Sequence, residues 1–362
     1  MKQTASLSVV GIHPSESKSF IDAFLRPVLE QKIIAASAID TSYAALWKSI
    51  SELYNAGGKR LRSYMTLLTY QAYSDTPYQA IIPAAAAQEL LHLAMLIHDD
   101  IIDRDEIRYG VKNVQSQYFD LYTPHLTDTD ERQHYAQSSA MLAGDLLISE
   151  AFVLVTQTSV SASTIMAAQQ LLGSAIFQVI GGELLDTEAT FKGDAAAHPL
   201  IIAEQKTASY SFVSPFLMGA TLADASNEQK EILKKLGTQL GIAYQIRDDI
   251  MGIFGNETIT GKSAEGDLRE GKRTLLIEEF YRIASPAQQA EFTSLFGQSN
   301  MTAKQAERTR ELLIESGAKK AVESMIEEFQ HTCVVLVETL DISETHRQSF
   351  TQLIQLCLQR DQ

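Results

Sequence analysis

The sequence predicts an all-helical fold in which packed helices enclose a central cavity. Apolar residues recur every three or four positions in five long segments, residues 82–102, 139–156, 163–185, 201–222 and 228–253. No pair of segments shows the alternating pattern of paired strands. The sequence also contains no repeat, linker or low-complexity tract that would divide it. We therefore expect a single domain over residues 1–362.

Prolines and polar stretches mark the ends of these segments. Pro83 stands at the start of the first segment, where a run of alanines at residues 84–87 favours helix. Residues 122–134 are predicted to form a surface loop before the second segment, and residues 191–199 a loop after the third. Pro215 lies inside the fourth segment and is expected to kink that helix.

Composition narrows the class of protein and its location. The formal net charge of -15 argues against a surface that binds nucleic acid. Cys333 and Cys357 lie in apolar runs, so we expect core residues and no disulfide or thiolate metal site. The N-terminal apolar stretch is too short for a secretory signal, and no uninterrupted apolar run reaches membrane-spanning length. These features predict a cytoplasmic protein without an integral membrane segment.

Three carboxylates end the first helical segment, in the sequence HDDIID at residues 98–103. An acidic cluster is usually a solvated helix face. Here the preceding residues 90–97 are almost all apolar, so the helix should be buried and its carboxylates should need cations. Asp99 and Asp103 lie one turn apart on one face and can reach the same hard cation, with Asp100 beside them. His92 falls on that face as well.

A second acidic pair, Asp248 and Asp249, lies in the fifth segment between apolar residues, and Gln245 precedes Asp248 by one turn. Carboxylates on two helices suggest Mg²⁺, which proteins usually hold with one or two carboxylates and substrate phosphates. Phosphates need further cations. Glycine-rich basic segments supply candidates at residues 57–62 (GGKRLR), 261–262 (GK) and 271–273 (GKR).

The order of these motifs resembles that of the trans-polyprenyl diphosphate synthase family. GGKRLR, the two aspartate-rich helices, LAGD (142–145), QKT (205–207) and TGK (260–262) follow the family's order over roughly residues 50–280. The resemblance implies an isoprenoid synthase-type helical bundle around a deep cavity, a homodimer, and Mg²⁺ as the cofactor. It also implies condensation of isopentenyl diphosphate with an allylic diphosphate.

The resemblance carries roles to individual residues. The metal ligands correspond to Asp99, Asp100, Asp103, Asp248 and Asp249. The isopentenyl diphosphate site corresponds to Gly58, Lys59, Arg62 and His92, and the allylic diphosphate site to Arg108, Lys206, Gln245, Lys262 and Lys272. Thr207 is placed near the reacting carbon, where its dipole, that of Gln245 and the Lys206 carbonyl could stabilise a cation. The resemblance also implies that the departing diphosphate takes the proton, which fits a sequence in which no histidine of the motifs is an obvious base.

Three positions depart from the family pattern. Tyr109 stands where the family usually has a second arginine, Gly252 replaces the last carboxylate of the second motif, and Ser63 replaces a common proline. None of these changes removes a carboxylate of the first motif, so we expect them to be tolerated. Glu183 and Asp186 stand where the family usually has Gln and Asp, and Tyr210 is interpreted as a packing residue.

The helix that carries Asp99 also predicts the product length. Met95 and Leu91 precede Asp99 by one and two turns, and the resemblance places the floor of the channel at Ala94 and Met95. Neither is aromatic, which disfavours a fifteen-carbon product. The sequence thus favours geranylgeranyl diphosphate, with a longer chain as the runner-up, although Met95 could also be plain core filler.

Two other functions stay open on the sequence alone. A class I terpene cyclase shares the aspartate-rich helix and the helical cavity, but it would have no use for Lys59, Arg62 and His92. A non-catalytic subunit of an active synthase is supported only by Tyr109 and Gly252. The intact first motif argues against that interpretation.

Overall fold

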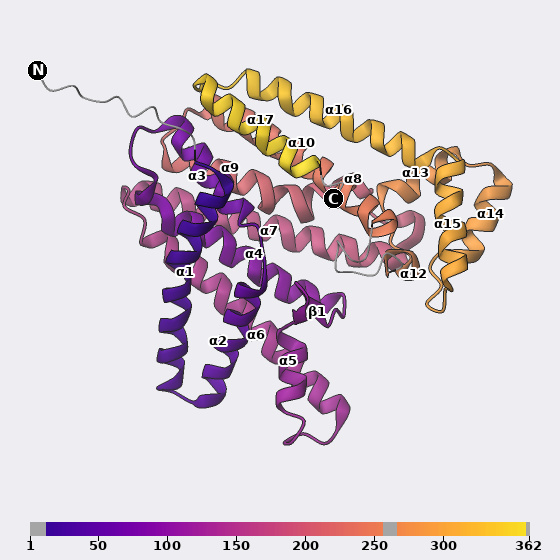
Figure 1. Cartoon of the computed structure of the whole chain (residues 1–362), viewed down its shortest axis with the longest axis horizontal. Coiled ribbons are helices and arrows are strands. Elements are labelled where there is room, and N and C mark those ends of the chain that lie inside the picture. The colour runs from indigo at the N-terminus through magenta and orange to yellow at the C-terminus, as the bar shows by residue number, and fades with distance from the viewer. Residues whose placement is uncertain (1–11, 256–265, 360–362) are drawn as a thin grey trace, which may run out of the picture.

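The computed structural model describes residues 12–255 and 266–359, and this part of the chain is built almost entirely of helices (Figure 1). The first half contains α1 (Pro14–Ser37), α2 (Thr41–Ala56), α3 (Leu61–Tyr73), η1 (Tyr78–Ile81), α4 (Ile82–Ile102), α5 (Val114–Leu121), α6 (Thr129–Thr156) and α7 (Ala162–Lys192). The second half contains η2 (Gly193–Ala195), α8 (Pro199–Ile202), η3 (Ala203–Val213), α9 (Ser214–Leu222), α10 (Asn227–Phe254), α12 (Gly266–Glu270), α13 (Leu275–Ile283), α14 (Pro286–Leu295), α15 (Ala303–Glu315), α16 (Ala318–Glu338) and α17 (Glu344–Leu358). The prediction of an all-helical fold is therefore confirmed.

Two large apolar clusters form most of the core, and α10 and α16 run through both. The larger cluster includes residues of α1 to α7, α9 and α17, and it contains Leu236 of α10 and Val337 of α16. The smaller cluster is formed mainly by α13 to α15 together with other turns of α10 and α16. A third, small cluster joins Ala175 and Val179 of α7 to Tyr210 of η3. Cys333 and Cys357 are buried free cysteines of the larger cluster, as expected from their apolar surroundings.

Capping side chains set where two of the long helices begin. Asp128 accepts hydrogen bonds from the backbone N–H groups of Asp130 and Glu131, so α6 starts at Thr129, inside the predicted loop 122–134. The side chain of Ser161 accepts from the N–H of Thr164 at the start of α7. That helix continues to Lys192, past the predicted end at residue 185. The bounds of α4 and α10 agree closely with the predicted segments 82–102 and 228–253.

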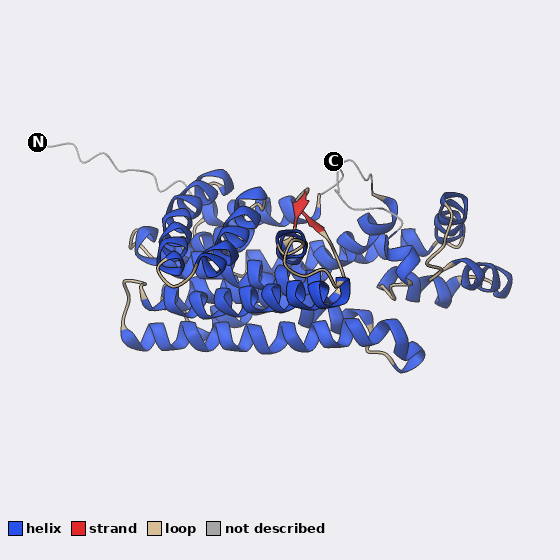
Figure 2. Cartoon of the chain, turned by 90° about the horizontal axis from the view of Figure 1, so that it is seen from below, coloured by secondary structure: helices blue, strands red, loops and turns tan. Residues whose placement is uncertain are grey.

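The prediction that the chain lacks paired strands was wrong for one short hairpin, drawn in red in Figure 2. Strands β1 (Ile107–Arg108) and β2 (Val111–Lys112) pair antiparallel directly after α4. Tyr109 and Gly110 form the turn, and both have positive φ angles, 54° and 76°. Strands of two residues are too short to produce an alternating pattern, so periodicity could not reveal them.

The fourth predicted helix has an unusual geometry, because the π-helix η3 separates α8 from α9. Pro215 lies in the first turn of α9, so the π-helix ends where the proline was expected to disturb the helix. Glycines let the neighbouring helices approach η3 closely. A Cβ atom on Gly182 of α7 would lie 2.2 Å from the backbone nitrogen of Lys206, and one on Gly241 of α10 would lie 2.4 Å from the Ala208 Cα atom.

Three helical stretches are long and apolar enough to cross a membrane by length and composition, Tyr78–Ile102, Thr129–Thr156 and Ala162–Lys192. The sequence-based expectation considered only uninterrupted apolar runs and missed them, because polar residues interrupt each stretch. In the fold, 72% of the most apolar window is buried in the first stretch, 50% in the second and 28% in the third. Helix α7 is therefore the least buried of the three, and most residues of its apolar window are exposed or only partly buried.

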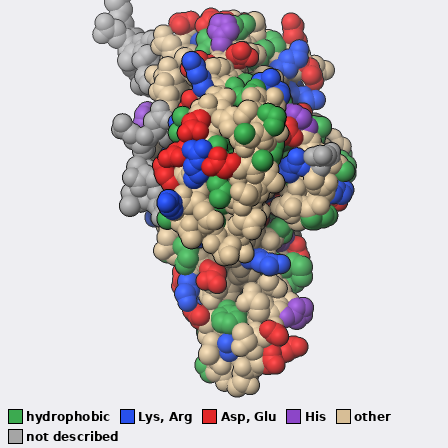
Figure 3. Space-filling model, turned by 90° about the vertical axis from the view of Figure 1, so that its right-hand side faces the viewer, with side chains coloured by type: hydrophobic (Ala, Val, Ile, Leu, Met, Phe, Trp, Pro, Cys, Tyr) green, Lys and Arg blue, Asp and Glu red, His purple; other side chains and the backbone are tan. Residues whose placement is uncertain are grey.

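Acidic and basic side chains intermix on the end of the molecule that carries α14 and α15 (Figure 3). Arg308 of α15 forms an ion pair with Glu291 of α14 at 2.7 Å. It also pairs with Glu311 and Glu315 of its own helix. These contacts join α14 to α15 at the surface.

Candidate active site

A cavity of about 1640 Å³ lies between α4, α6, α7, η3 and α10, and the β1–β2 hairpin forms part of its wall. Ligand pockets typically measure about 300–1,000 Å³, so this cavity has room for more than one small molecule. Most of the predicted site residues line it, namely Gly58, Lys59, Arg62, His92, Met95, Asp99, Asp103, Arg108, Lys206, Thr207, Gln245, Asp248, Asp249 and Lys272. Leu91, Ala94 and Asp100 are not among its lining residues, and Lys262 lies outside the described residues.

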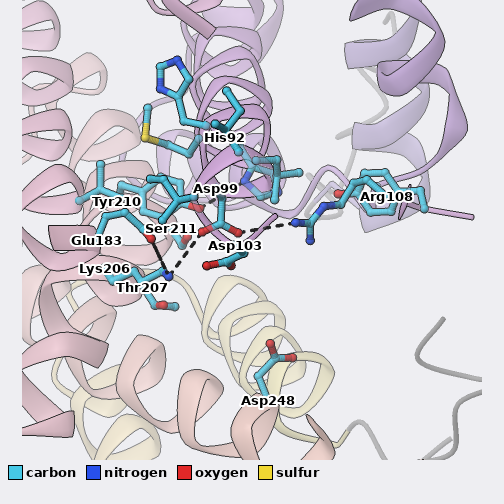
Figure 4. A pocket seen from close by; sticks show the side chains of 18 of the residues that line it. His92, Asp99, Asp103, Arg108, Glu183, Lys206, Thr207, Tyr210, Ser211 and Asp248 are labelled. Carbon is cyan, nitrogen blue, oxygen red and sulfur yellow. Dashed lines mark hydrogen bonds and ion pairs between the residues drawn. The ribbon is translucent and has the colours of Figure 1, made fainter. Parts of the chain in front are cut away.

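Three carboxylates converge on one side of the cavity. Asp99 and Asp103 project from the last turn of α4 and Glu183 from α7, and one carboxylate oxygen of each lies within 4.8 Å of the others (Figure 4). Burial raises the pKa of Glu183 to about 7, although Lys206 acts in the opposite direction. Hard oxygen donors at this spacing fit a divalent cation, which would also relieve their mutual repulsion.

Lys206 of η3 lies against this carboxylate cluster. Its ammonium nitrogen is 2.6 Å from Asp186 Oδ2, 2.9 Å from Glu183 Oε2 and 3.4 Å from Asp99 Oδ1. Burial lowers the pKa of Lys206, but the surrounding carboxylates outweigh burial and raise it, so the side chain remains protonated. No role could be assigned to Glu183 and Asp186 from the sequence, because their pairing with Lys206 depends on the packing of α7 against η3.

The assignment of Asp100 as a metal ligand is not supported by its position. The side chain is 2% exposed and pairs with Arg108, whose Nε donates to Asp100 Oδ1 at 2.8 Å. Arg108 also lies 3.6 Å from Asp99 and lines the cavity. Adjacent helix residues point about 100° apart, so Asp100 faces the hairpin while Asp99 faces the cavity. Asp100 therefore positions Arg108.

The second acidic pair lies on α10, and Figure 4 shows that Asp248 comes from a different helix than Asp99 and Asp103. A chain of hydrogen bonds reaches this pair from η3. The Thr207 hydroxyl donates to Gln245 Oε1 at 2.5 Å, and Gln245 Nε2 donates to Asp249 Oδ1 at 2.8 Å. Burial raises the pKa of Asp249 to about 7, while Lys272 is the first of the groups that oppose this shift.

A cationic group, formed by Lys59 and Arg62, lines the cavity as well, and neutral polar side chains surround Arg62. Arg62 donates to Ser211 Oγ at 2.6 Å and to the Tyr210 hydroxyl at 3.4 Å, and that hydroxyl lies 3.3 Å from His92 Nδ1. Burial, and then the nearby Arg62, hold the pKa of His92 well below its usual value, so the imidazole is neutral. Tyr210 packs against Ala175 and Val179 of α7 in a small apolar cluster, as expected of a packing residue. It also lines the cavity and bridges Arg62 and His92.

Arg60 anchors the glycine-rich turn. It is 7% exposed and donates to Asp22 Oδ1 at 2.9 Å, to the Gly57 carbonyl at 2.8 Å and to the Tyr54 carbonyl at 2.8 Å. Its guanidinium carbon lies 3.8 Å from the centre of the Tyr54 ring. Gly58, with a φ of 101°, needs glycine's conformational freedom. The turn therefore presents its lysine from a fixed backbone.

Two departures from the family pattern have a structural explanation. Ser63 donates its backbone N–H to Glu89 Oε1 at 2.9 Å, a bond that a proline could not make. Tyr109 packs its ring over Gly57, where a Cβ atom would lie 2.7 Å from the tyrosine Cγ. The hairpin turn is thus seated on the glycine-rich turn, and both contribute to the cavity wall.

The predicted floor of the product channel is only partly in the cavity wall. Met95 lines the cavity, whereas Leu91 and Ala94 are fully buried in the main apolar cluster. Ala94 is one residue from Met95, so it points about 100° away and into the core. Met95 packs against Ala175 and Val179 of α7 and Tyr210 of η3. Further apolar residues that line the cavity are Met141 of α6 and Ile180 and Leu184 of α7. Periodicity along α4 alone could not identify these partners.

Comparison with known proteins agrees with this geometry. A family model described as polyprenyl synthetase matches residues 44–313. Geranylfarnesyl diphosphate synthase of Aeropyrum pernix is 34% identical over 278 residues, which cover 75% of this chain and 80% of that protein. Geranylgeranyl diphosphate synthase of Methanosarcina mazei is 30% identical over 281 residues, which cover 77% and 79% of the two chains.

A solved structure is similar over nearly the whole chain. It is geranylgeranyl pyrophosphate synthase from Corynebacterium glutamicum, complexed with isoprenyl diphosphate and magnesium, with a TM-score of 0.86 and 26% identity. The similarity covers 96% of this chain and 98% of that one. The helical fold and the carboxylate groups that face one deep cavity define an enzyme that transfers prenyl groups. The chain belongs to the polyprenyl synthetase family.

Proposed function

We propose that this protein condenses isopentenyl diphosphate head-to-tail with an allylic diphosphate, with Mg²⁺ as its cofactor and geranylgeranyl diphosphate as its main product. One observation carries the proposal. A single cavity is lined both by carboxylates that need cations, including Asp99 and Asp248, and by a separate cationic group that includes Lys59 and Arg62. Carboxylates recruit a metal to one diphosphate, while lysine and arginine can bind a second one directly.

The carboxylate cluster fits the proposed metal. Asp99, Asp103 and Glu183 would hold Mg²⁺ from one side, and Asp248 of α10 would contribute from the other. When bound, Mg²⁺ offsets the charge of a diphosphate and makes it a better leaving group. Arg108, Lys206 and Lys272 supply fixed positive charge to the same wall of the cavity.

The side chains around the reacting carbon suit a carbocation-like transition state. The allylic carbon–oxygen bond breaks with its electron pair on the diphosphate, and the double bond of isopentenyl diphosphate forms the new carbon–carbon bond. The proton lost from the condensed chain passes to the departing diphosphate. The hydrogen bonds of Thr207 and Asp249 fix the Gln245 amide, so its dipole is oriented before the reaction begins.

The product length rests on the apolar side of the cavity. Met95 precedes Asp99 by one turn of α4 and lines the cavity. Its side chain is flexible, whereas an aromatic side chain at this position would close the channel. A longer product is the second candidate, because the cavity is large and the relative from Aeropyrum pernix is named for geranylfarnesyl diphosphate.

The test is turnover by the purified chain with Mg²⁺, isopentenyl diphosphate and dimethylallyl, geranyl or farnesyl diphosphate in turn. Mass spectrometry should detect mainly geranylgeranyl diphosphate. A cyclised hydrocarbon formed from one allylic substrate, without incorporation of isopentenyl diphosphate, would indicate a terpene cyclase. A folded chain that turns over only when a second synthase is added would indicate a non-catalytic subunit.

We also propose that the protein acts as a homodimer through α6 and α7. Large apolar side chains are exposed on both helices, including Leu142 on α6 and Phe177 on α7, which is 81% exposed. A second copy that covers this face would bury them. Phe177→Glu should shift the sedimentation behaviour toward a monomer, while Val335→Glu on α16, where the apolar side chain is 49% exposed, should not.

The expected single domain and cytoplasmic location are proposals as well. The sharing of α10 and α16 by both large apolar clusters supports one folding unit. Two buried free cysteines are compatible with a reducing compartment. One cooperative unfolding transition, and recovery of the protein in the soluble cytoplasmic fraction, would support these two proposals.

A further inference from the structure

Gly252 leaves an open position on the cavity-facing side of α10. It follows Asp248 by four residues, so both residues lie on the same side of the helix, and both line the cavity. A side chain at position 252 would therefore project beside the Asp248 carboxylate. Glycine provides no such side chain.

A carboxylate from another helix fills this position. Asp267 Oδ2 lies 2.1 Å from the point where a Cβ atom of residue 252 would stand, and Asp267 lines the same cavity. The short helix α12, which carries Asp267, packs against α10. Backbone hydrogen bonds fix it from the other side. The Lys272 N–H donates to the Asp267 carbonyl at 3.1 Å, and the Gly297 N–H donates to the Leu268 carbonyl at 2.9 Å.

We propose that Asp267 is the third carboxylate of the α10 cation site and takes the place of the side chain that Gly252 lacks. The inference rests on the proposed Mg²⁺ dependence. Oxygen donors are the ligands that Mg²⁺ prefers, and a carboxylate on α12 can serve as well as one on α10 if its position is fixed. The glycine is then required, because any larger residue at position 252 would displace Asp267.

Metal affinity tests this role without measuring turnover. Mg²⁺ is titrated into the full chain in the presence of inorganic diphosphate, and binding is followed by calorimetry and by the rise in melting temperature. Asp267→Asn should bind Mg²⁺ about 10–100-fold more weakly, the usual loss when a supporting group of a metal site is removed. Glu270→Gln, which removes a carboxylate from the same helix but not from the cavity lining, should lose clearly less affinity than Asp267→Asn.

A transplanted carboxylate gives the decisive comparison. Gly252→Asp alone should weaken Mg²⁺ binding, because its Cβ atom would collide with the Asp267 carboxylate. Asp267→Ala should weaken it as well. The double variant Gly252→Asp/Asp267→Ala should recover most of the lost affinity, since one carboxylate again occupies the position.

Three results would overturn the inference. Asp267→Asn could bind Mg²⁺ as tightly as the parent. A folded double variant could bind no better than Asp267→Ala, or Glu270→Gln could lose as much affinity as Asp267→Asn. A parent chain that gains no stability from Mg²⁺ and diphosphate would instead refute the metal site of the proposed function, and the role of Asp267 with it.

Discussion

Arg60→Met should destabilise the protein and weaken binding of isopentenyl diphosphate at the same time. The substitution removes a 2.9 Å ion pair with Asp22, two hydrogen bonds to backbone carbonyls and a cation–π contact with Tyr54. Removing one partner of a buried ion pair costs about 3–5 kcal/mol, because the other charge loses its compensation. Asp22 keeps Lys18 at 3.3 Å and the Tyr54 hydroxyl at 2.7 Å. We therefore expect a cost near the lower limit, about 3 kcal/mol.

Urea unfolding at one fixed protein concentration measures this cost, and steady-state kinetics measures its effect on the glycine-rich turn. The KM for isopentenyl diphosphate should rise by about tenfold or more, equivalent to about 1.4 kcal/mol, and that for the allylic primer should change less. Arg26→Met is the matched control, because Arg26 is exposed and its contact with Asp22 is 3.8 Å long. It should cost less than about 1 kcal/mol.

The dependence of stability on acidic pH gives a further check on the ion pair between Asp22 and Arg60. Burial raises the pKa of Asp22, but hydrogen bonds from Tyr54 and Arg60 outweigh burial and lower it overall. A lowered carboxyl pKa stabilises the fold above the ordinary value of 3.8, and this contribution is lost as the pH falls through the lowered pKa. The difference between parent and Arg60→Met should thus shrink only in acid. Equal stability of the two proteins at neutral pH, or an equal loss in Arg26→Met, would refute the reasoning.

Four other outcomes follow from the site. Asp99→Ala or Asp103→Ala should lose at least about a hundredfold in turnover while the circular dichroism spectrum is preserved, and near-normal rates would exclude them as metal ligands. Lys59→Ala should raise the KM for isopentenyl diphosphate far more than that for the primer, and equal effects would mean that the two substrate sites are wrongly assigned. Met95→Phe should shorten the main product and Met95→Ala lengthen it, as read by mass spectrometry; unchanged products would remove Met95 from the floor. Burial raises the pKa of Glu183 to about 7, so Mg²⁺ affinity by calorimetry should increase from pH 6 to pH 8, and a flat profile would contradict its role as a ligand.

Most of the site could be predicted because its residues lie on regular helices with strong periodicity. Asp99 and Asp103 share a face of α4 as their spacing requires, and both line the cavity. The same helical geometry explains why other predicted residues of that helix do not line the cavity. Asp100 and Ala94 were grouped with their neighbours in sequence, although each points about 100° away from the adjacent site residue.

The rest of the site depends on contacts between distant segments. Glu183 of α7 and Asp99 of α4 come together around Lys206 of η3, which pairs with both. Asp267 reaches position 252 from a separate helix. The π-helical geometry of η3 has no hydrophobic period that a sequence window could recognise. The polar contacts of Tyr210 were not predicted for the same reason, since its two partners come from α3 and α4.

The π-helix determines how the carboxylate cluster beside Lys206 and the binding region beside Arg62 are oriented relative to each other. In such a helix each hydrogen bond spans five residues, so one turn holds more residues than in an α-helix, and Lys206 and Ser211 diverge less about the axis than five α-helical positions would. One of them meets the carboxylate cluster, and the other receives the hydrogen bond of Arg62. In an α-helix the same two residues would diverge by about 140°, given 100° per residue. A single residue lost from this segment would therefore rotate one binding region away from the other while leaving every side chain of both regions in the sequence.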